Sequence, residues 1–363
     1  MALRCGLVGL PNVGKSMLFN GLSNGNAASA NFPFCTIEPN VGVVAVPDSR
    51  MQLLATLADS KNIIPTAIEF VDIAGLVKDA HQGEGLGNKF LNHIREVDAI
   101  VHVIRCFEDE DVVHVAGSVD PVFDKQIIDH ELRCKDIDTL TKRLEKIEKL
   151  AKQGPKAQQH TYELLNLFLT ALKQGRDARA IPVAAADQPL IDEWQLLTSK
   201  PVIYFANVDE ATILGSANPH LAALKEVTEN SKMIIGSTAL EAQINALNGE
   251  EKDFFLKEYN LMESALDKLI QSAYSLLDLI TYFTVGPQEV RAWTIQNGTK
   301  APQAAGVIHT DFQRGFIKAE VISFEDYKTY KSESGCREAG KLRIEGKEYL
   351  VQDGDVMLFR FNV

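Results

Sequence analysis

The chain has 363 residues and a mass of 40.0 kDa, and 45% of its residues are hydrophobic and 24% charged. This composition is typical of a globular protein, and the length predicts two or three domains of roughly 100–200 residues each. Lysine and arginine number 37 against 49 aspartates and glutamates, which gives a net charge of −12. That balance excludes a protein that coats nucleic acid or an anionic membrane by bulk charge, although it can conceal local patches.

The start of the chain and its cysteines predict a cytoplasmic protein. The opening MALRCGLVGL has only a short apolar stretch and no small-residue cleavage site, so it does not resemble a signal peptide. No apolar run approaches the roughly 18–20 residues of a membrane span, and no membrane partner is expected. The five cysteines lack metal-site spacing and are expected to be reduced thiols; they are Cys5, Cys35, Cys106, Cys134 and Cys336.

Residues 1–278 predict a doubly wound α/β domain. A short apolar strand over residues 2–8 leads into a glycine-rich turn and a helix from Lys15 to Leu22. Four later apolar runs are continuous rather than alternating, which is typical of parallel strands covered on both faces. These expected strands span residues 67–71, 99–104, 202–206 and 233–236.

Residues 125–180 predict a helical insertion in this domain. Apolar residues between Gln126 and Gly154 recur at alternating spacings of three and four, which predicts a narrow coiled-coil seam; they are Ile137, Leu140, Leu144, Ile147 and Ala151. Gly154 and Pro155 end this helix, and a second amphipathic helix follows over 156–174. The two helices are expected to form an antiparallel arm that projects from the sheet.

The arm differs in charge from the rest of the chain. It contains 12 basic and 8 acidic residues, a net charge of +4, whereas the remainder sums to −16. Its basic side chains fit either a solvated coiled-coil face or a contact with RNA, and both interpretations stay open. The residues concerned are Lys142, Arg143, Lys146, Lys149 and Lys152.

Residues 279–363 predict a second, smaller domain. Short alternating strands surround one helix-like stretch over 304–313, a pattern that favours a β-grasp-like module of about 80 residues. This segment holds 11 basic and 11 acidic residues, so its contacts must depend on shape and local chemistry. The expected strands span residues 282–285, 289–295, 316–322, 341–344, 347–351 and 356–361.

Residues 9–16 read GLPNVGKS and match the phosphate-binding pattern G-x-x-x-x-G-K-[ST], with a predicted strand before and a helix after. Backbone N–H groups of this loop are expected to point at the α and β phosphates. Lys15 would reach the β and γ phosphates, and the Ser16 hydroxyl would ligate Mg²⁺. The expected nucleotide-binding residues are Asn12, Val13, Gly14, Lys15, Ser16 and Met17.

Asp72 ends an apolar strand and begins a D-x-x-G pattern, in which GTPase-class proteins hold Mg²⁺ through water. Thr36 lies between the two motifs in a segment with few regular-structure signals. We expect it to ligate Mg²⁺ only when the γ-phosphate is present. The predicted metal ligands are therefore Ser16, Thr36 and Asp72.

Leu76 follows the glycine of the D-x-x-G pattern, where Ras-like enzymes carry a water-orienting glutamine. Because leucine cannot orient water, hydrolysis must use another group. His81, in the glycine-rich stretch DAHQGEGLG, and His114, in an acidic loop, are the two candidates.

Asn207, Val208, Asp209 and Glu210 stand where guanine-specific proteins carry N-K-x-D. Valine replaces the lysine and glutamate the terminal aspartate, so the carboxylate geometry that accepts guanine N1–H and N2–H₂ is lost and adenine is no longer repelled. Asp209 could still reach the base through a one-residue slip. Ser237, after a later strand, marks the expected base-contacting loop.

Together these segments resemble the Obg-like ATPase family, called YchF in bacteria. The resemblance covers nearly the whole chain, and His309 to Ile322 is similar to the TGS module of that family. The segments that carry it are GLPNVGKS, NFPFCTIEPNVGVVAVPDSR, DIAGLVKDAHQGEGLGNKFL, NVDE and HTDFQRGFIKAEVI.

The resemblance implies ATP hydrolysis in preference to GTP, Mg²⁺ dependence and association with the ribosome, expected at the large subunit. The arm and the TGS-like module are expected RNA contacts. In that family a loop histidine is the proposed catalytic group, and His114 matches its place better than His81. Met17 stands where members usually have threonine, which should matter little because only its backbone N–H is needed. A GTPase and a ribosome or RNA adaptor with a vestigial nucleotide site are the alternatives.

Overall fold

A computed structural model describes residues 3–24, 40–73, 86–114, 117–151, 156–229, 231–247 and 249–362. The chain forms two compact units. The first comprises residues 1–43 and 69–269, and the second comprises residues 44–68 and 270–363. The expected boundary after residue 278 differs from this division, because residues 44–68 join the second unit through contacts that are distant in sequence.

The first unit is built on a sheet with the strand order β2-β4-β1-β5-β6-β7. Its five strands from β4 to β7 pair in parallel, and β5 is buried along its whole length. The predicted doubly wound α/β architecture is thereby confirmed. The strands are β1 (Arg4–Val8), β2 (Val41–Ala45), β4 (Ala67–Asp72), β5 (Ala99–Arg105), β6 (Val202–Asn207) and β7 (Lys232–Gly236).

The chain order reverses around β1, since β4 lies on one side of it and β5 on the other. In open parallel sheets such a switch point opens a crevice at the carboxyl ends of the strands. The loop after β1 leads into α1 at this edge. Helices of this unit besides the arm are α1 (Lys15–Asn24), α3 (Leu86–Glu96), α6 (Gln188–Asp192), α7 (Glu210–Ile213), α8 (Pro219–Glu226), α9 (Thr238–Ala246), α10 (Gly249–Glu258) and the start of α11 (Ala265–Leu276).

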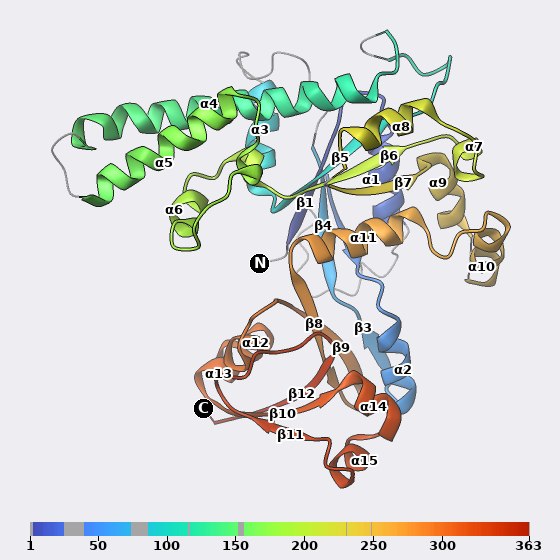
Figure 1. Cartoon of the computed structure of the whole chain (residues 1–363). Helices are drawn as coiled ribbons and strands as arrows, with labels where there is room; N and C mark the ends of the chain where they lie inside the picture. Colours follow the sequence, from blue (N-terminus) through green and yellow to red (C-terminus); the bar gives the residue numbers. More distant parts are fainter. Residues whose placement is uncertain are drawn as a thin grey trace. The chain divides into compact units, whose positions relative to one another are not determined.

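Helices α4 (Pro121–Ala151) and α5 (Lys156–Lys173) form the projecting antiparallel arm that the sequence predicts (Figure 1). At 1.5 Å per residue, α4 is about 46 Å long. Its predicted seam residues Ile137, Leu140, Leu144 and Ile147 pack in one cluster with Leu165, Phe168 and Leu172 of α5.

The middle of α4 is held by a buried carboxylate. Asp136 is 1% exposed and accepts hydrogen bonds from the backbone N–H groups of Leu197 and Thr198, each at 2.8 Å. The Thr198 hydroxyl donates a third bond, at 2.7 Å. The middle of α4 is therefore bonded to the short helix η3 (Leu197–Ser199), which shortly precedes β6.

The second unit contains a sheet with the order β11-β10-β12-β8-β9-β3. Strand β12 runs parallel to β8 between antiparallel neighbours, which is the β-grasp arrangement that the sequence predicts. The strands are β3 (Asn62–Ile64), β8 (Leu279–Val285), β9 (Glu289–Gln296), β10 (Phe316–Ser323), β11 (Arg343–Glu345) and β12 (Asp355–Phe361), and the helices are α2 (Ser49–Leu57), α12 (Ala301–Ile308), α13 (Thr310–Arg314), α14 (Phe324–Tyr330) and α15 (Glu333–Glu338).

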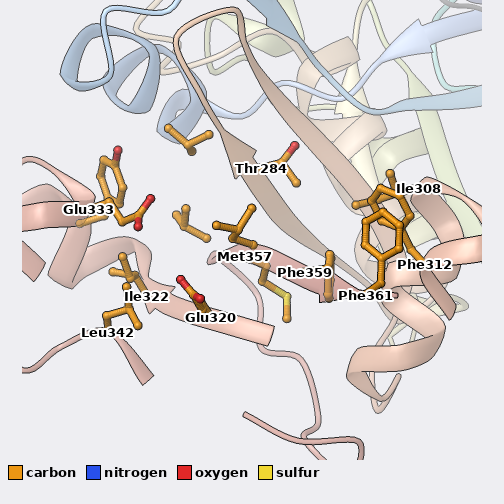
Figure 2. A pocket seen from close by; sticks show the side chains of 14 residues that line it. Thr284, Ile308, Phe312, Glu320, Ile322, Glu333, Leu342, Met357, Phe359 and Phe361 are labelled. Atoms are coloured by element: carbon orange, nitrogen blue, oxygen red, sulfur yellow. The ribbon is translucent and has the colours of Figure 1, made fainter. Parts of the chain in front are cut away.

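An apolar cavity of about 260 Å³ lies in this unit, where β12 continues past the end of β8. Figure 2 shows Ile308, Phe312 and Phe361 at one end of the cavity and Glu333 at the other.

Two expected elements of the second unit differ from the observed ones. The helix expected over 304–313 is two helices, because His309 adopts an extended backbone and its ring accepts from the Asp311 N–H at 3.2 Å. The strand expected over 347–351 is reduced to a bridge between Lys300 and Leu350.

Residues 44–68 attach to the second unit through a strand and an arginine. Strand β3 pairs in parallel with β9, with Asn62 opposite Glu289. The Arg50 guanidinium binds Asp48 and Asp353, each at 2.7 Å, and lies 5.0 Å from the centre of the Phe283 ring. Local sequence patterns do not predict the pairings with Glu289, Asp353 and Phe283, because these partners lie more than 200 residues away in the chain.

Within the described residues, no helix combines the length and the apolar character that crossing a bilayer requires.

Candidate functional site

The loop between β1 and α1 has the geometry of a phosphate-binding loop. Gly14 has a φ of +94°, and a Cβ atom placed on it would lie 2.3 Å from the Asn207 Nδ2 atom. Only glycine satisfies both the left-handed backbone and the close approach. The loop and the first turn of α1 surround a hollow of about 390 Å³, lined by Leu10, Pro11, Asn12, Gly14, Lys15, Ser16 and Met17.

Asn207, the last residue of β6, holds this loop through its side chain. Its side chain is buried, and its Nδ2 donates to the Val13 carbonyl at 2.9 Å. Its Oδ1 accepts from the Thr238 backbone N–H at 3.0 Å, at the start of α9. One amide group thus joins the phosphate loop, β6 and the connection after β7. An aspartate could not replace it, because the bond to Val13 needs a donor.

Lys15 and Asp72 meet in an ion pair. Lys15 is 8% exposed, and its Nζ donates to Oδ1 of Asp72, at the end of β4. The structure therefore brings together the predicted phosphate-binding lysine and a predicted metal-binding carboxylate. Ser16 and Met17 are exposed at the start of α1.

The oxygen donors at this edge suit Mg²⁺. The Ser16 hydroxyl and the Asp72 carboxylate are hard ligands of the kind that bind this ion together with phosphate oxygens and water. The described part of the chain contains no cluster of three histidine, cysteine or acidic side chains that could hold a metal by itself. The Ser16 and Asp72 oxygens fit a metal that also binds phosphate oxygens. Thr36, the third predicted ligand, lies outside the described residues.

The side chains of the altered N-K-x-D segment are committed to other partners. Val208 is buried in a core cluster with Ile104, Tyr204 and Leu221, and its N–H donates to the Gly236 carbonyl at 3.0 Å. Its side chain therefore packs into the core and does not line the hollow.

The two carboxylates of this segment also have partners. Asp209 caps α7 by accepting from the Thr212 N–H at 2.8 Å. Glu210 accepts a hydrogen bond from the Tyr259 hydroxyl, and this bond raises the pKa of Tyr259. Ser237 caps α9 by accepting from the Leu240 N–H at 3.5 Å.

His114 is turned into the protein. Its Nε2 lies 3.0 Å from Oδ2 of Asp124, in the first turn of α4, and the two side chains are 5% and 2% exposed. Burial raises the pKa of Asp124. The other carboxylate oxygen, Oδ1, is buried without a hydrogen-bond partner among the described residues. His81 lies outside the described residues.

The acidic loop between β5 and His114 (residues 106–113) is held by hydrogen bonds near both of its ends. The buried guanidinium of Arg105 donates to the carbonyls of Phe107, Asp109 and Val112 at 2.9–3.2 Å. The Asn12 side chain, in the phosphate loop, donates to the Val113 carbonyl at 3.1 Å. The acidic loop thus reaches the mouth of the phosphate site through its backbone.

Sequence reasoning missed three partners of the predicted residues: Thr238, Tyr259 and Asp124. Thr238 lies 31 residues from Asn207, and Tyr259 lies 49 residues from Glu210. Asp124 is closer to His114, but an acidic residue in the first turn of a helix is ordinarily explained by the helix dipole. No local signal separates these residues from their neighbours.

The parallel sheet, the braced phosphate loop and the carboxylate at the end of β4 define a P-loop nucleoside triphosphatase of the GTPase-like class. Residues 4–153 match the family model MMR_HSR1, described as a 50S ribosome-binding GTPase. Residues 279–362 match YchF-GTPase_C, described as a protein of unknown function.

Full-length relatives carry the comparison further. The chain is 52% identical to the ribosome-binding ATPase YchF of Bacillus subtilis, with 100% of both chains covered. It is 45% identical to Obg-like ATPase 1 of Gallus gallus, over 99% of this chain and 93% of that protein. The structure of the Schizosaccharomyces pombe YchF GTPase matches with a TM-score of 0.90 and 39% identity, over 99% of this chain and 97% of that one.

The chain belongs to the YchF family of Obg-like ATPases, as the resemblance of its motifs predicts.

Replacing Gly14 by alanine is expected to weaken nucleotide binding about 100-fold or more, since the added Cβ would collide with Asn207. Gly175→Ala is the matched control, because Gly175 also has a positive φ, +83°, but a Cβ placed on it would meet nothing within 4 Å beyond its chain neighbours. The control should lose about 1 kcal/mol of stability and bind nucleotide normally. Fluorescent-nucleotide titration and thermal unfolding measure both effects, and equal affinities in the two variants would contradict the assignment.

Proposed function

We propose that this chain is a Mg²⁺-dependent ATPase that hydrolyses ATP in preference to GTP and associates with the ribosome. The observation that carries the nucleotide preference is the separation of two roles within residues 207–210. Asn207 keeps the loop-bracing role of a guanine-specific motif, whereas the residues after it have no side chain arranged for guanine.

A guanine site needs a carboxylate aimed at N1–H and N2–H₂ of the base, and the available carboxylates have other partners. Asp209 is the cap of α7, and Glu210 accepts from Tyr259. Moving Asp209 to the base would remove the cap, at a cost of about 1 kcal/mol. Because adenine presents an acceptor at N1, it gains when no carboxylate occupies that position.

The hydrolytic chemistry is assigned to residues at the phosphate loop. Lys15 would contact the β and γ phosphates, and the loop N–H groups from Asn12 to Met17 would hold the phosphate chain. Ser16, Asp72 and Thr36 would hold Mg²⁺, which neutralises developing phosphate charge when bound. His114 is the proposed group that acts on the attacking water, with His81 as the alternative.

Ribosome association rests on the named activity of the relatives and on the charge of the arm. The B. subtilis relative is called a ribosome-binding ATPase, and the arm of this chain has a net charge of +4. Lys142 and Lys146 are exposed on α4. The proposed contacts are ribosomal RNA of the large subunit, with the arm and the TGS-like second unit as the binding surfaces, and they imply a cytoplasmic location.

GTP hydrolysis is the second candidate, because the S. pombe relative is called a GTPase. An adaptor with a vestigial nucleotide site is the third, but it gives no reason for an intact Lys15–Asp72 pair and an asparagine-braced loop.

Lys15→Ala is expected to lower ATP turnover about 100-fold or more, because one charged donor to the developing phosphate charge is removed. Lys232→Ala, at an exposed lysine of β7, is the control and should hydrolyse ATP at the wild-type rate. Release of phosphate is measured with and without ribosomes. If the Lys15→Ala protein hydrolyses ATP as fast as the wild type under both conditions, the adaptor replaces the ATPase.

Reversing the charge of Lys142 and Lys146 to glutamate is expected to reduce cosedimentation with ribosomes and to flatten its dependence on salt, because phosphate contacts are lost. The control reverses Lys225 and Lys232, two exposed lysines outside the arm, and changes the net charge equally. Equal binding by the two double variants would identify the basic residues of the arm as a solvated face.

A further inference from the structure

The contact between His114 and Asp124 joins two parts of the first unit that have different proposed roles. His114 ends the acidic loop that reaches the phosphate loop, and Asp124 belongs to the first turn of α4. The same helix continues into the projecting arm (Figure 1). One hydrogen bond of 3.0 Å therefore connects the base of the arm to the histidine proposed for hydrolysis.

The His114 ring is withdrawn from the phosphate site in this arrangement. The Val113 carbonyl is bonded to Asn12 at the mouth of the site, but the next side chain turns inward and is 5% exposed. The residues that line the phosphate hollow run from Leu10 to Met17, and His114 is not one of them. A group that orients or deprotonates water must come within hydrogen-bond reach of it. While Nε2 is bonded to Asp124, this nitrogen is not available to a water at the phosphate loop.

Hydrogen bonds hold the chain both before and after His114. Arg105 fixes the loop before it, and Asp120 caps α4 by accepting from the N–H groups of Val122 and Phe123 at 3.1 and 3.0 Å. Release of the ring thus requires its bond to Asp124 to break, through a side-chain rotation or a shift of the first turn of α4.

Only one oxygen of the Asp124 carboxylate has a hydrogen-bond partner among the described residues. Asp124 is 2% exposed, yet its Oδ1 has no hydrogen-bond partner in the described part of the chain. Buried polar atoms without partners are uncommon in folded proteins. The Asp124 carboxylate therefore accepts fewer hydrogen bonds from the described residues than its two oxygens could.

We propose that Asp124 is a positioning residue that holds His114 away from the phosphate site, and that displacement of the first turn of α4, when a partner engages the arm, releases it. This inference rests on the proposed function, in which His114 acts in hydrolysis. It adds a coupling between the arm and the rate of hydrolysis that passes through the Asp124 side chain.

The test compares single and double variants of the full chain in steady-state ATP hydrolysis without ribosomes. Asp124→Ala should raise kcat about three- to tenfold at unchanged KM, as expected from the loss of one restraining hydrogen bond. The double variant Asp124→Ala/His114→Ala should be as slow as His114→Ala. A lower or unchanged kcat in Asp124→Ala would overturn the proposal.

Two further variants separate restraint from a general effect on folding. Asp124→Asn keeps an acceptor for the ring and should restore a rate close to the wild type. Asp129→Asn removes a buried carboxylate of the same helix that pairs with Lys125 and does not contact His114, and it should leave kcat unchanged. An increase in Asp129→Asn equal to that of Asp124→Ala would show a loosened helix instead of a released histidine.

A second readout is independent of turnover. The rate of carbethoxylation of His114 by diethyl pyrocarbonate, mapped by mass spectrometry, should be slow in the wild type and faster in Asp124→Ala. Equal reactivity would overturn the withdrawn position itself. Wild-type turnover by His114→Ala, with faster modification in Asp124→Ala, would instead remove the catalytic assignment in the proposed function and, with it, the coupling.

Discussion

The buried side chain of Asn207 is the constraint on which the arrangement of the site depends. Its amide donates to the phosphate loop at Val13 and accepts from the backbone at Thr238. Its position leaves no room for a side chain at residue 14. The amide at the end of β6 thus fixes the loop at Val13 and accounts for the glycine at residue 14.

The phosphate loop and the core strands could be predicted because their signals are local. The glycine and lysine spacing of residues 9–16 and the continuous apolar runs are complete within a few residues, and each predicted strand of the first unit was confirmed within about two residues. The attachment of residues 44–68 to the second unit could not be predicted, since β3 pairs with β9 more than 200 residues away. The same reason hides Thr238 and Tyr259 from sequence analysis.

Two covalent paths lead away from the phosphate site. The chain between Asn40 and Asp72 supplies α2 and β3 to the second unit before it returns to the predicted metal ligand. The acidic loop after β5 leads through His114 into α4 and the arm. The segments proposed to contact the nucleotide are thus continuous in the chain with both surfaces proposed for ribosome contact.

The central claim is that residues 207–210 keep the brace of a guanine-specific motif and have lost its base recognition. Equilibrium competition of ATP and GTP against a fluorescent nucleotide, with Mg²⁺ and purified wild-type chain, tests this claim most directly. The account predicts that ATP competes at a concentration about tenfold lower than GTP. Tighter binding of GTP would contradict it and would mean that a carboxylate of this segment reaches the base.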